Sequence, residues 1–309
     1  MTNETFTLDG LAADAPALLP RAISDNIWNK VQAASLVPGL STQTPVILGE
    51  NGVAHVTARP QAGIVGENEA APGSKIKLGA KTFKPVTASV MVELSKRAIK
   101  TNPVGVLGIL EKELAGAVAR QVDLAVFHGR AANTGALLTG GSPFLSQATN
   151  RVELTGAKNA DKEIWDGYGL VIAGESTDFT GFAWDPRLVA MLANARDTQG
   201  RRLNPDINMG GGISNYSGQR VGISKSVSGQ VDSSVDTGIR GIGGDWDSLR
   251  FGFNDQITIT PIPYGDPMGT GDVAARGAVV YKAEVTFGWT VMDLNSFVIY
   301  ENKVADVEA

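Results

Sequence analysis

Hydrophobic and polar residues alternate with a period of two in two segments of the N-terminal third. The first covers residues 52–59 and the second covers residues 81–93. This period places successive side chains on opposite faces of a β-strand. We therefore expect two strands that form an extended hairpin loop over residues 52–93.

The connection between these two strands is unusually long. Residues 60–79 are rich in glycine and contain few large apolar side chains that could pack the tip. Most connections in compact domains have about 2–6 residues, and an isolated two-stranded hairpin is at best marginally stable in water. Such a hairpin needs a neighbour to lie on, so we expect an intersubunit element of an assembling protein.

Charged residues of the hairpin are separated by sign, with two glutamates before the lysines. An ordinary solvated loop with mixed surface charge explains the same pattern and stays open as the alternative. The candidate interface residues are Gln61, Glu67, Glu69, Lys75, Lys77, Lys81 and Lys84.

The clearest helical pattern opens at Asn102-Pro103 and continues to His128, with Gly129 as a C-cap. About 25 residues at 1.5 Å each give a rod about 40 Å long. The residues expected to form its buried stripe are Leu107, Leu110, Leu114 and Val118.

Shorter elements surround this helix in the sequence and together predict an α+β protein. Residues 1–22 are expected to form an extended arm, followed by a short helix over residues 23–31. Asp185-Pro186 is expected to cap and open a helix that runs to Arg196. The other expected elements are a helix over 164–173 and strands within 181–184, 220–223, 249–260, 279–291 and 297–300.

Composition excludes several classes of protein. The 309 residues include no Cys and two His, which rules out a disulfide framework or a Cys nucleophile and argues against a His-rich metal site. Apolar stretches are short, so we expect no membrane partner. The net charge is 27 − 32 = −5, which argues against sequence-independent duplex binding as the main activity.

Motifs that would indicate catalysis are missing from the sequence. No Gly-Lys dipeptide occurs, so there is no Walker-type phosphate loop. No motif places a nucleophile or a carboxylate beside His55 or His128, and the carboxylates of residues 161–175 and 245–247 are best explained as caps and surface charges. We therefore expect no enzymatic activity, no cofactor and no metal.

Several motifs follow one another in a recognisable order and spacing in the second half of the chain. They are Phe182-Ala183-Trp184-Asp185-Pro186, Asp197-Thr198-Gln199-Gly200-Arg201-Arg202-Leu203, Ser217 to Ser224, Gly243-Gly244-Asp245-Trp246 with Leu249 to Gly252, and Val280 to Val291. Their order and spacing resemble those of a known family, the major capsid proteins of tailed bacteriophages, and the resemblance covers about residues 20–301.

This resemblance implies the tailed-phage major capsid fold, with an N-terminal arm, an extended hairpin loop, a peripheral domain containing a long spine helix, and an apical domain. The implied divisions are 1–22 for the arm, 52–93 for the hairpin, 161–272 for the apical domain, and 23–51, 94–160 and 273–309 for the peripheral domain.

The resemblance also implies that the chain assembles with itself into pentamers and hexamers of an icosahedral shell around double-stranded DNA. The implied place is the virion capsid, assembled in the host bacterial cytoplasm. Portal and separate scaffolding proteins are implied partners, and the resemblance is also compatible with decoration proteins as partners. The alternatives are an encapsulin-like nanocompartment shell that encloses cargo enzymes and, third, an enzyme.

Some relatives of this family join their subunits by an isopeptide bond between a hairpin lysine and an asparagine. Here Lys75, Lys77, Lys81 or Lys84 would supply the amine, and Asn295 or Asn302 the amide. The reaction requires a desolvated, deprotonated lysine beside a carboxylate, and the sequence gives no sign of that burial. We therefore expect a non-covalent shell.

Overall fold

The computed structural model describes most of the chain after residue 34. The described residues are 35–58, 60–67, 70, 73–101, 106–139, 142–174, 178–207, 213–254 and 258–302. The expected arm over residues 1–22 and the expected helix over residues 23–31 lie outside them.

A five-stranded sheet is built around the long strand β12 (Ala278–Val291). Strand β4 (Val86–Ser95) is antiparallel to β12 on one side, and β10 (Leu249–Phe253) and β11 (Thr258–Ile262) are antiparallel to it on the other. Strand β1 (Thr42–Gln43) pairs with β10. The expected strand over 279–291 is confirmed, and the expected strand region 249–260 contains two strands that share β12 as partner.

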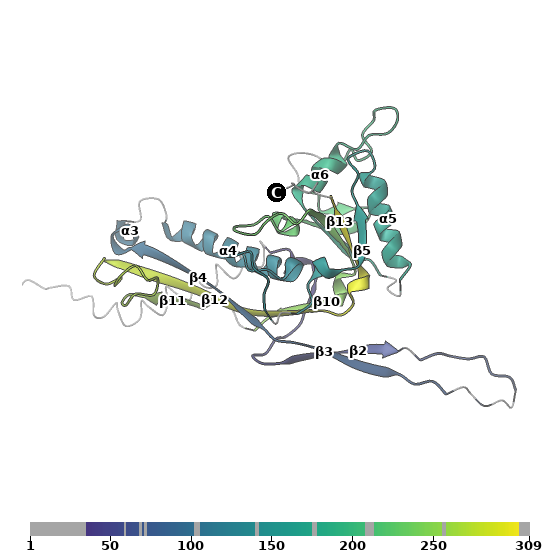
Figure 1. Ribbon diagram of the computed structural model, residues 1–309, viewed down its shortest axis with the longest axis horizontal. Coiled ribbons are helices and arrows are strands. Elements are labelled where there is room, and N and C mark those ends of the chain that lie inside the picture. Colours follow the sequence, from purple (N-terminus) through teal and green to yellow (C-terminus); the bar gives the residue numbers. More distant parts are fainter. Residues whose placement is uncertain are drawn as a thin grey trace, which may run out of the picture.

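Helix α4 (Val106–His128) lies along this sheet (Figure 1). Leu110, Leu114 and Val118 of the expected stripe are buried in the core between α4 and the sheet, whereas the side chain of Leu107 lies outside the described residues. The long helix is confirmed from residue 106 onward. The short helices α2 (Val37–Leu40) and α3 (Lys96–Thr101) were not expected from the sequence.

A six-stranded sheet forms the second part of the body and carries two helices, α5 (Ala160–Ile172) and α6 (Pro186–Ala193). The Asp185 side chain accepts a hydrogen bond from the Arg187 N–H at 2.8 Å, which confirms the expected cap. Helix α6 ends before Arg196 because the chain turns back there to pair Arg196 with Arg202. In sheet order, the strands are β5 (Asn150–Glu153), β13 (Phe297–Glu301), β9 (Ile239–Gly244), β6 (Gly181–Trp184), β8 (Gln219–Ile223) and β7 (Asn215–Tyr216).

Boundaries of these two sheets differ from the expected domain boundaries. Strands β10 and β11 fall inside the expected apical segment 161–272 but belong to the five-stranded sheet. Strand β13 falls inside the expected peripheral segment 273–309 but pairs with β5 and β9 in the six-stranded sheet. The chain passes between the sheets several times, and strand pairing between distant segments leaves no local sequence signal.

Strands β2 (Asn51–Ala58) and β3 (Lys77–Phe83) form a separate two-stranded hairpin that extends away from both sheets (Figure 1). The prediction of one strand over residues 81–93, and with it the hairpin boundary at residue 93, is wrong. Strand β3 ends at Phe83, and β4 begins at Val86 with a different partner. Pro85 lies at the break, where its missing N–H cannot donate to a strand ladder.

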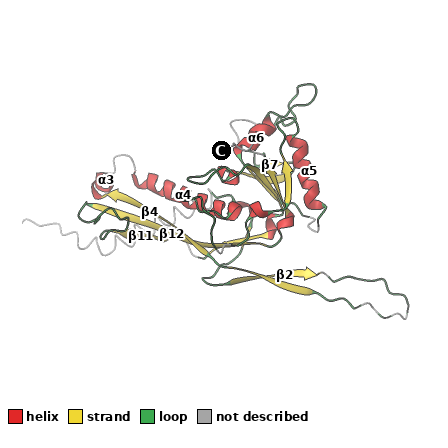
Figure 2. Ribbon diagram, viewed as in Figure 1, coloured by secondary structure: helices red, strands yellow, loops and turns green. Residues whose placement is uncertain are grey.

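Short 3₁₀ turns complete the described chain. Figure 2 shows described loop residues that continue the hairpin beyond the end of β2. The 3₁₀ turns are Leu145–Gln147, Lys225–Ser228, Trp246–Ser248 and Leu294–Ser296.

Among the described residues, no helix has the length and apolar character needed to cross a membrane.

Candidate assembly interface

Most of the candidate interface residues lie on the outer part of the hairpin. Gln61, Glu67, Lys75 and Lys77 are exposed, and Glu69 lies outside the described residues. The Gln61 backbone N–H donates a hydrogen bond of 2.8 Å to the Ser74 hydroxyl, which joins the two sides of the hairpin beyond its strands. The hairpin therefore presents these polar side chains to solvent, where a partner could reach them.

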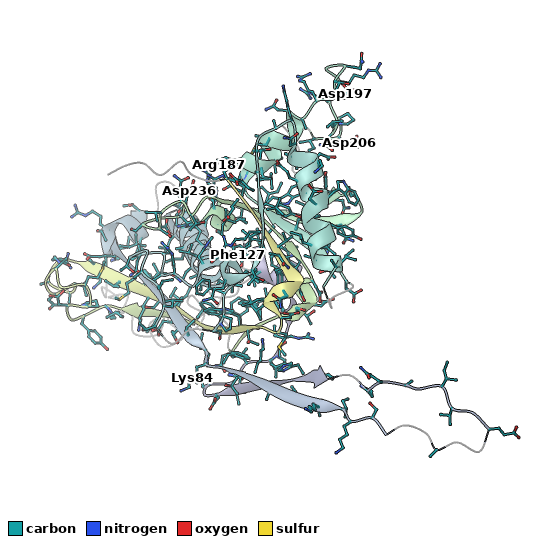
Figure 3. The ribbon with its side chains drawn as sticks, turned by 45° about the vertical axis from the view of Figure 1, so that its right-hand side comes forward. Lys84, Phe127, Arg187, Asp197, Asp206 and Asp236 are labelled. Carbon is teal, nitrogen blue, oxygen red and sulfur yellow. The ribbon has the colours of Figure 1, made fainter. Side chains whose placement is uncertain are left out.

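Lys81 and Lys84 lie at the root of the hairpin. The Lys81 ammonium donates to the carbonyl oxygens of Val291 and Met292, at 3.2 Å and 2.6 Å. This ammonium is therefore engaged at the end of β12 in its own chain. Lys84 is exposed between β3 and β4, where Figure 3 shows it beside the hairpin root. The six described candidates thus divide into a tip group and a root group.

Exposed aliphatic side chains on the hairpin are the main feature that the sequence analysis missed. Val56, Ile64, Val65, Ile76 and Leu78 have exposed fractions between 38% and 104%. Beyond the root of the hairpin, the described side chains on both faces of β2 and β3 are exposed or half-buried, so the alternating pattern does not report burial. The available signal was the presence of aliphatic residues in a segment that cannot pack on itself.

A groove of about 550 Å³ lies between helix α4 and strand β4. Its lining includes Val86, Val90 and Val118. The one carboxylate in the lining, Asp232, accepts a hydrogen bond of 3.2 Å from Arg120, so its charge is paired. This lining is suited to packing rather than to acid–base chemistry.

Two buried ionisable side chains on α4 have structural partners. His128 lies 3.0 Å, through Nε2, from the Val227 carbonyl oxygen, and burial lowers the pKa of His128 to about 4. Asp123 accepts hydrogen bonds from the Ser35 hydroxyl at 2.5 Å and from the Leu36 N–H at 3.1 Å. Burial, partly offset by these bonds, raises the pKa of Asp123 to about 6. Asp123 therefore fixes the start of the described chain to α4.

An ion-pair network joins the start of α6 to the chain before β9 (Figure 3). Arg187 contacts Asp185 at 2.9 Å and Asp236 at 2.6 Å, and Arg240 contacts Asp236 at 2.8 Å. Although partial burial acts in the opposite direction, the hydrogen bonds from Arg240, the Gly238 N–H and Arg187 lower the pKa of Asp236 to about 2. These contacts fasten the loop to the six-stranded sheet.

The fold and the projecting hairpin define a class of protein, a structural subunit with an α+β body and an arm that exposes aliphatic side chains. Residues 16–302 match the family model described as "Phage capsid family". The chain belongs to this family and is a tailed-phage major capsid protein, a component of the virion. The expected α+β class and shell function are confirmed, and the encapsulin-like alternative is not better supported.

Individual relatives agree with this assignment. The chain is 24% identical over 308 residues to "Probable major capsid protein gp17" of Mycobacterium phage L5, which covers 93% of this chain and 88% of the relative. A solved structure from Gordonia phage Cozz has a TM-score of 0.79 and 49% identity, with 87% of each chain covered. A structure from Mycobacterium phage Ogopogo has a TM-score of 0.76 and 28% identity, with 87% of this chain and 92% of that chain covered.

Proposed function

We propose that the chain assembles into pentamers and hexamers that close an icosahedral shell, and that the β2–β3 hairpin lies on the adjacent subunit. The observation that carries this proposal is the exposure of Ile64, Ile76 and Leu78 on an arm that leaves the body. Scattered exposed aliphatic residues are common on protein surfaces, but a series on one projecting element is typical of an interaction site.

Burial of these side chains would provide the driving force for the contact. Fully burying one Val, Leu or Ile side chain contributes about 1.5–3 kcal/mol. A few such side chains on each hairpin, repeated in every subunit, offset part of the entropy lost on association. Gln61, Glu67, Glu69, Lys75 and Lys77 would form the polar rim around them. Lys84 would contact a partner near the root, and Lys81 would position the hairpin instead.

The body supplies the remaining parts of the shell. In this proposal the five-stranded sheet and α4 form the peripheral domain, and the six-stranded sheet forms the apical domain near the capsomer axis. The shell encloses double-stranded DNA without reading its sequence, and a net charge of −5 avoids a strongly cationic lumen. Portal, separate scaffolding and decoration proteins are the proposed partners, assembly takes place in the host cytoplasm, and the role is structural rather than catalytic.

Shortening the hairpin tests this function. Ala58 pairs with Lys77, so a two-residue turn between them would remove residues 59–76 and keep the strands paired. We expect a folded subunit, with an unchanged circular dichroism spectrum, that forms no closed shells in electron micrographs.

Point variants at the exposed aliphatic residues provide a matched control for the shortened hairpin. The double variant Ile64→Ser, Leu78→Ser should lose assembly, whereas Ile64→Val, Leu78→Ile should retain it because the apolar surface remains. Shells of normal size and yield from the shortened protein would contradict the proposed role of the hairpin.

A further inference from the structure

The hairpin root rests on two facing glycines of the five-stranded sheet. Gly252 on β10 and Gly288 on β12 are directly paired across the two strands. A methyl group added at Gly288 would lie 2.7 Å from Cε2 of Phe83, and one added at Gly252 would lie 1.8 Å from the Thr44 carbonyl oxygen. The segments that enter and leave the hairpin therefore lie directly on the backbone of this glycine pair, which other residues could not allow.

Two apolar side chains occupy the space above the glycines. Phe83 and Val46 are each 5% exposed, in contrast to the aliphatic residues farther along the hairpin. Val46 approaches both positions, at 2.9 Å from a Cβ added to Gly252 and 3.3 Å from one added to Gly288. The contact between the hairpin root and the two glycines is therefore close-packed, and one added methyl group would displace the hairpin root.

A second attachment lies farther along β12. The Lys81 ammonium bonds to the carbonyl oxygens of Val291 and Met292. Val291 is the third residue after Gly288, so the two positions lie about 10 Å apart along the strand. Two attachments at this separation fix a direction, whereas one alone would leave the hairpin free to pivot. We call the side chains of Val46, Lys81 and Phe83 with Gly252 and Gly288 the hairpin socket.

We propose that the hairpin socket sets the direction in which the hairpin projects and thereby the curvature of the shell. This inference rests on the proposed function, in which the hairpin lies on the next subunit. Glu67 lies 16 residues before Phe83 in the sequence, and a chain of that length can reach about 50 Å at most. Rotating the hairpin by about 10° at its root moves a point at that distance by about 9 Å, which is more than close-packed contacts tolerate.

The test changes the socket without changing the hairpin surface. Gly288→Ala places a methyl group against the Phe83 ring, and we expect folded subunits that lose wild-type-diameter shells and form open or differently sized particles. Adding Phe83→Val removes the ring from the methyl group and should restore the wild-type diameter. Particle diameter in negative-stain electron micrographs is the readout, because a general loss of stability would lower the yield without shifting the diameter.

A remote glycine provides the matched control. Gly167 lies on helix α5, far from the hairpin in sequence, and a methyl group there would lie 2.5 Å from the hydroxyl oxygen of Tyr300 on β13 of the six-stranded sheet. Gly167→Ala should therefore lower the melting temperature and leave the diameter of the particles unchanged. A diameter shift equal to that of Gly288→Ala would overturn the socket proposal, as would wild-type shells from Gly288→Ala.

Lys81→Met decides the matter if Gly288→Ala does not fold. This substitution keeps an unbranched side chain only one atom shorter and removes the hydrogen bonds to β12, so the diameter distribution should broaden. An unchanged distribution overturns the proposal. If the shortened hairpin abolishes shells while both socket variants assemble normally, the socket inference fails and the proposed function stands. If the shortened protein assembles normally, the proposed function itself fails.

Discussion

Leu114→Ala measures how strongly α4 is held on the five-stranded sheet. Leu114 is 1% exposed in the core that also contains Trp289 and Phe287. Burial of a leucine side chain contributes about 1.5–3 kcal/mol by transfer from water alone, and the cavity left by truncation raises the measured loss to about 2–5 kcal/mol. Because the five-stranded sheet packs against the site and limits its collapse, we expect a loss of about 3 kcal/mol or more.

Ile109→Ala is the matched control on the same helix. Ile109 is 53% exposed, and alanine has the higher helix propensity, so its free energy of unfolding should change by less than about 0.5 kcal/mol. Urea denaturation of unassembled subunits, followed by tryptophan fluorescence, gives both values. A loss below about 1 kcal/mol for Leu114→Ala, or equal losses for the two variants, would refute the packing described for α4.

Two further predictions concern pH and covalent linkage. The contribution of neutral His128 to the stability of the fold is complete above its unfolded pKa of 6.5 and is lost as the pH falls toward its folded pKa of about 4. The contribution of protonated Asp123 has the opposite dependence: it is complete below the unfolded pKa of 3.8 and is lost as the pH rises through the folded pKa of about 6. Each contribution amounts to about 3 kcal/mol at most. Asp123→Asn removes the contribution that declines with rising pH, so the free energy of unfolding should rise more steeply between pH 4.5 and 6.5 than in the wild type. An unchanged slope in urea titrations at these pH values would count against this prediction. Mature particles should give a single band near the chain mass on a denaturing gel, and a ladder that survives boiling would disprove a non-covalent shell.

Local sequence patterns were sufficient to predict the elements in which one face is buried along the whole length or in which the residues at the end carry a cap signal. Strand β12 has apolar residues at alternate positions facing α4, and Asp185-Pro186 carries its own cap signal. The change of partner at Pro85 was missed because β3 and β4 both alternate, and the partner of β4, strand β12, lies far away in the sequence. Periodicity predicts a strand but not the strand beside it.

The candidate interface shows the same limit. The exposed charges at the hairpin tip could be located from the sequence because they lie in a polar, glycine-rich segment. The role of Lys81 could not, since it depends on carbonyl groups more than 200 residues away. The seat formed by Gly252 and Gly288 also requires the register between β10 and β12, which a single sequence does not contain. A high glycine content indicates that other segments pack closely on the backbone at some positions, but it does not identify those positions or the segments.

Electron cryo-microscopy of assembled particles shows where each hairpin lies. We expect closed icosahedral shells in which the β2–β3 hairpin of every subunit lies on its neighbour, with Ile64, Ile76 and Leu78 buried in that contact. Closed shells in which the hairpins extend into solvent, with these three side chains exposed, would contradict this expectation.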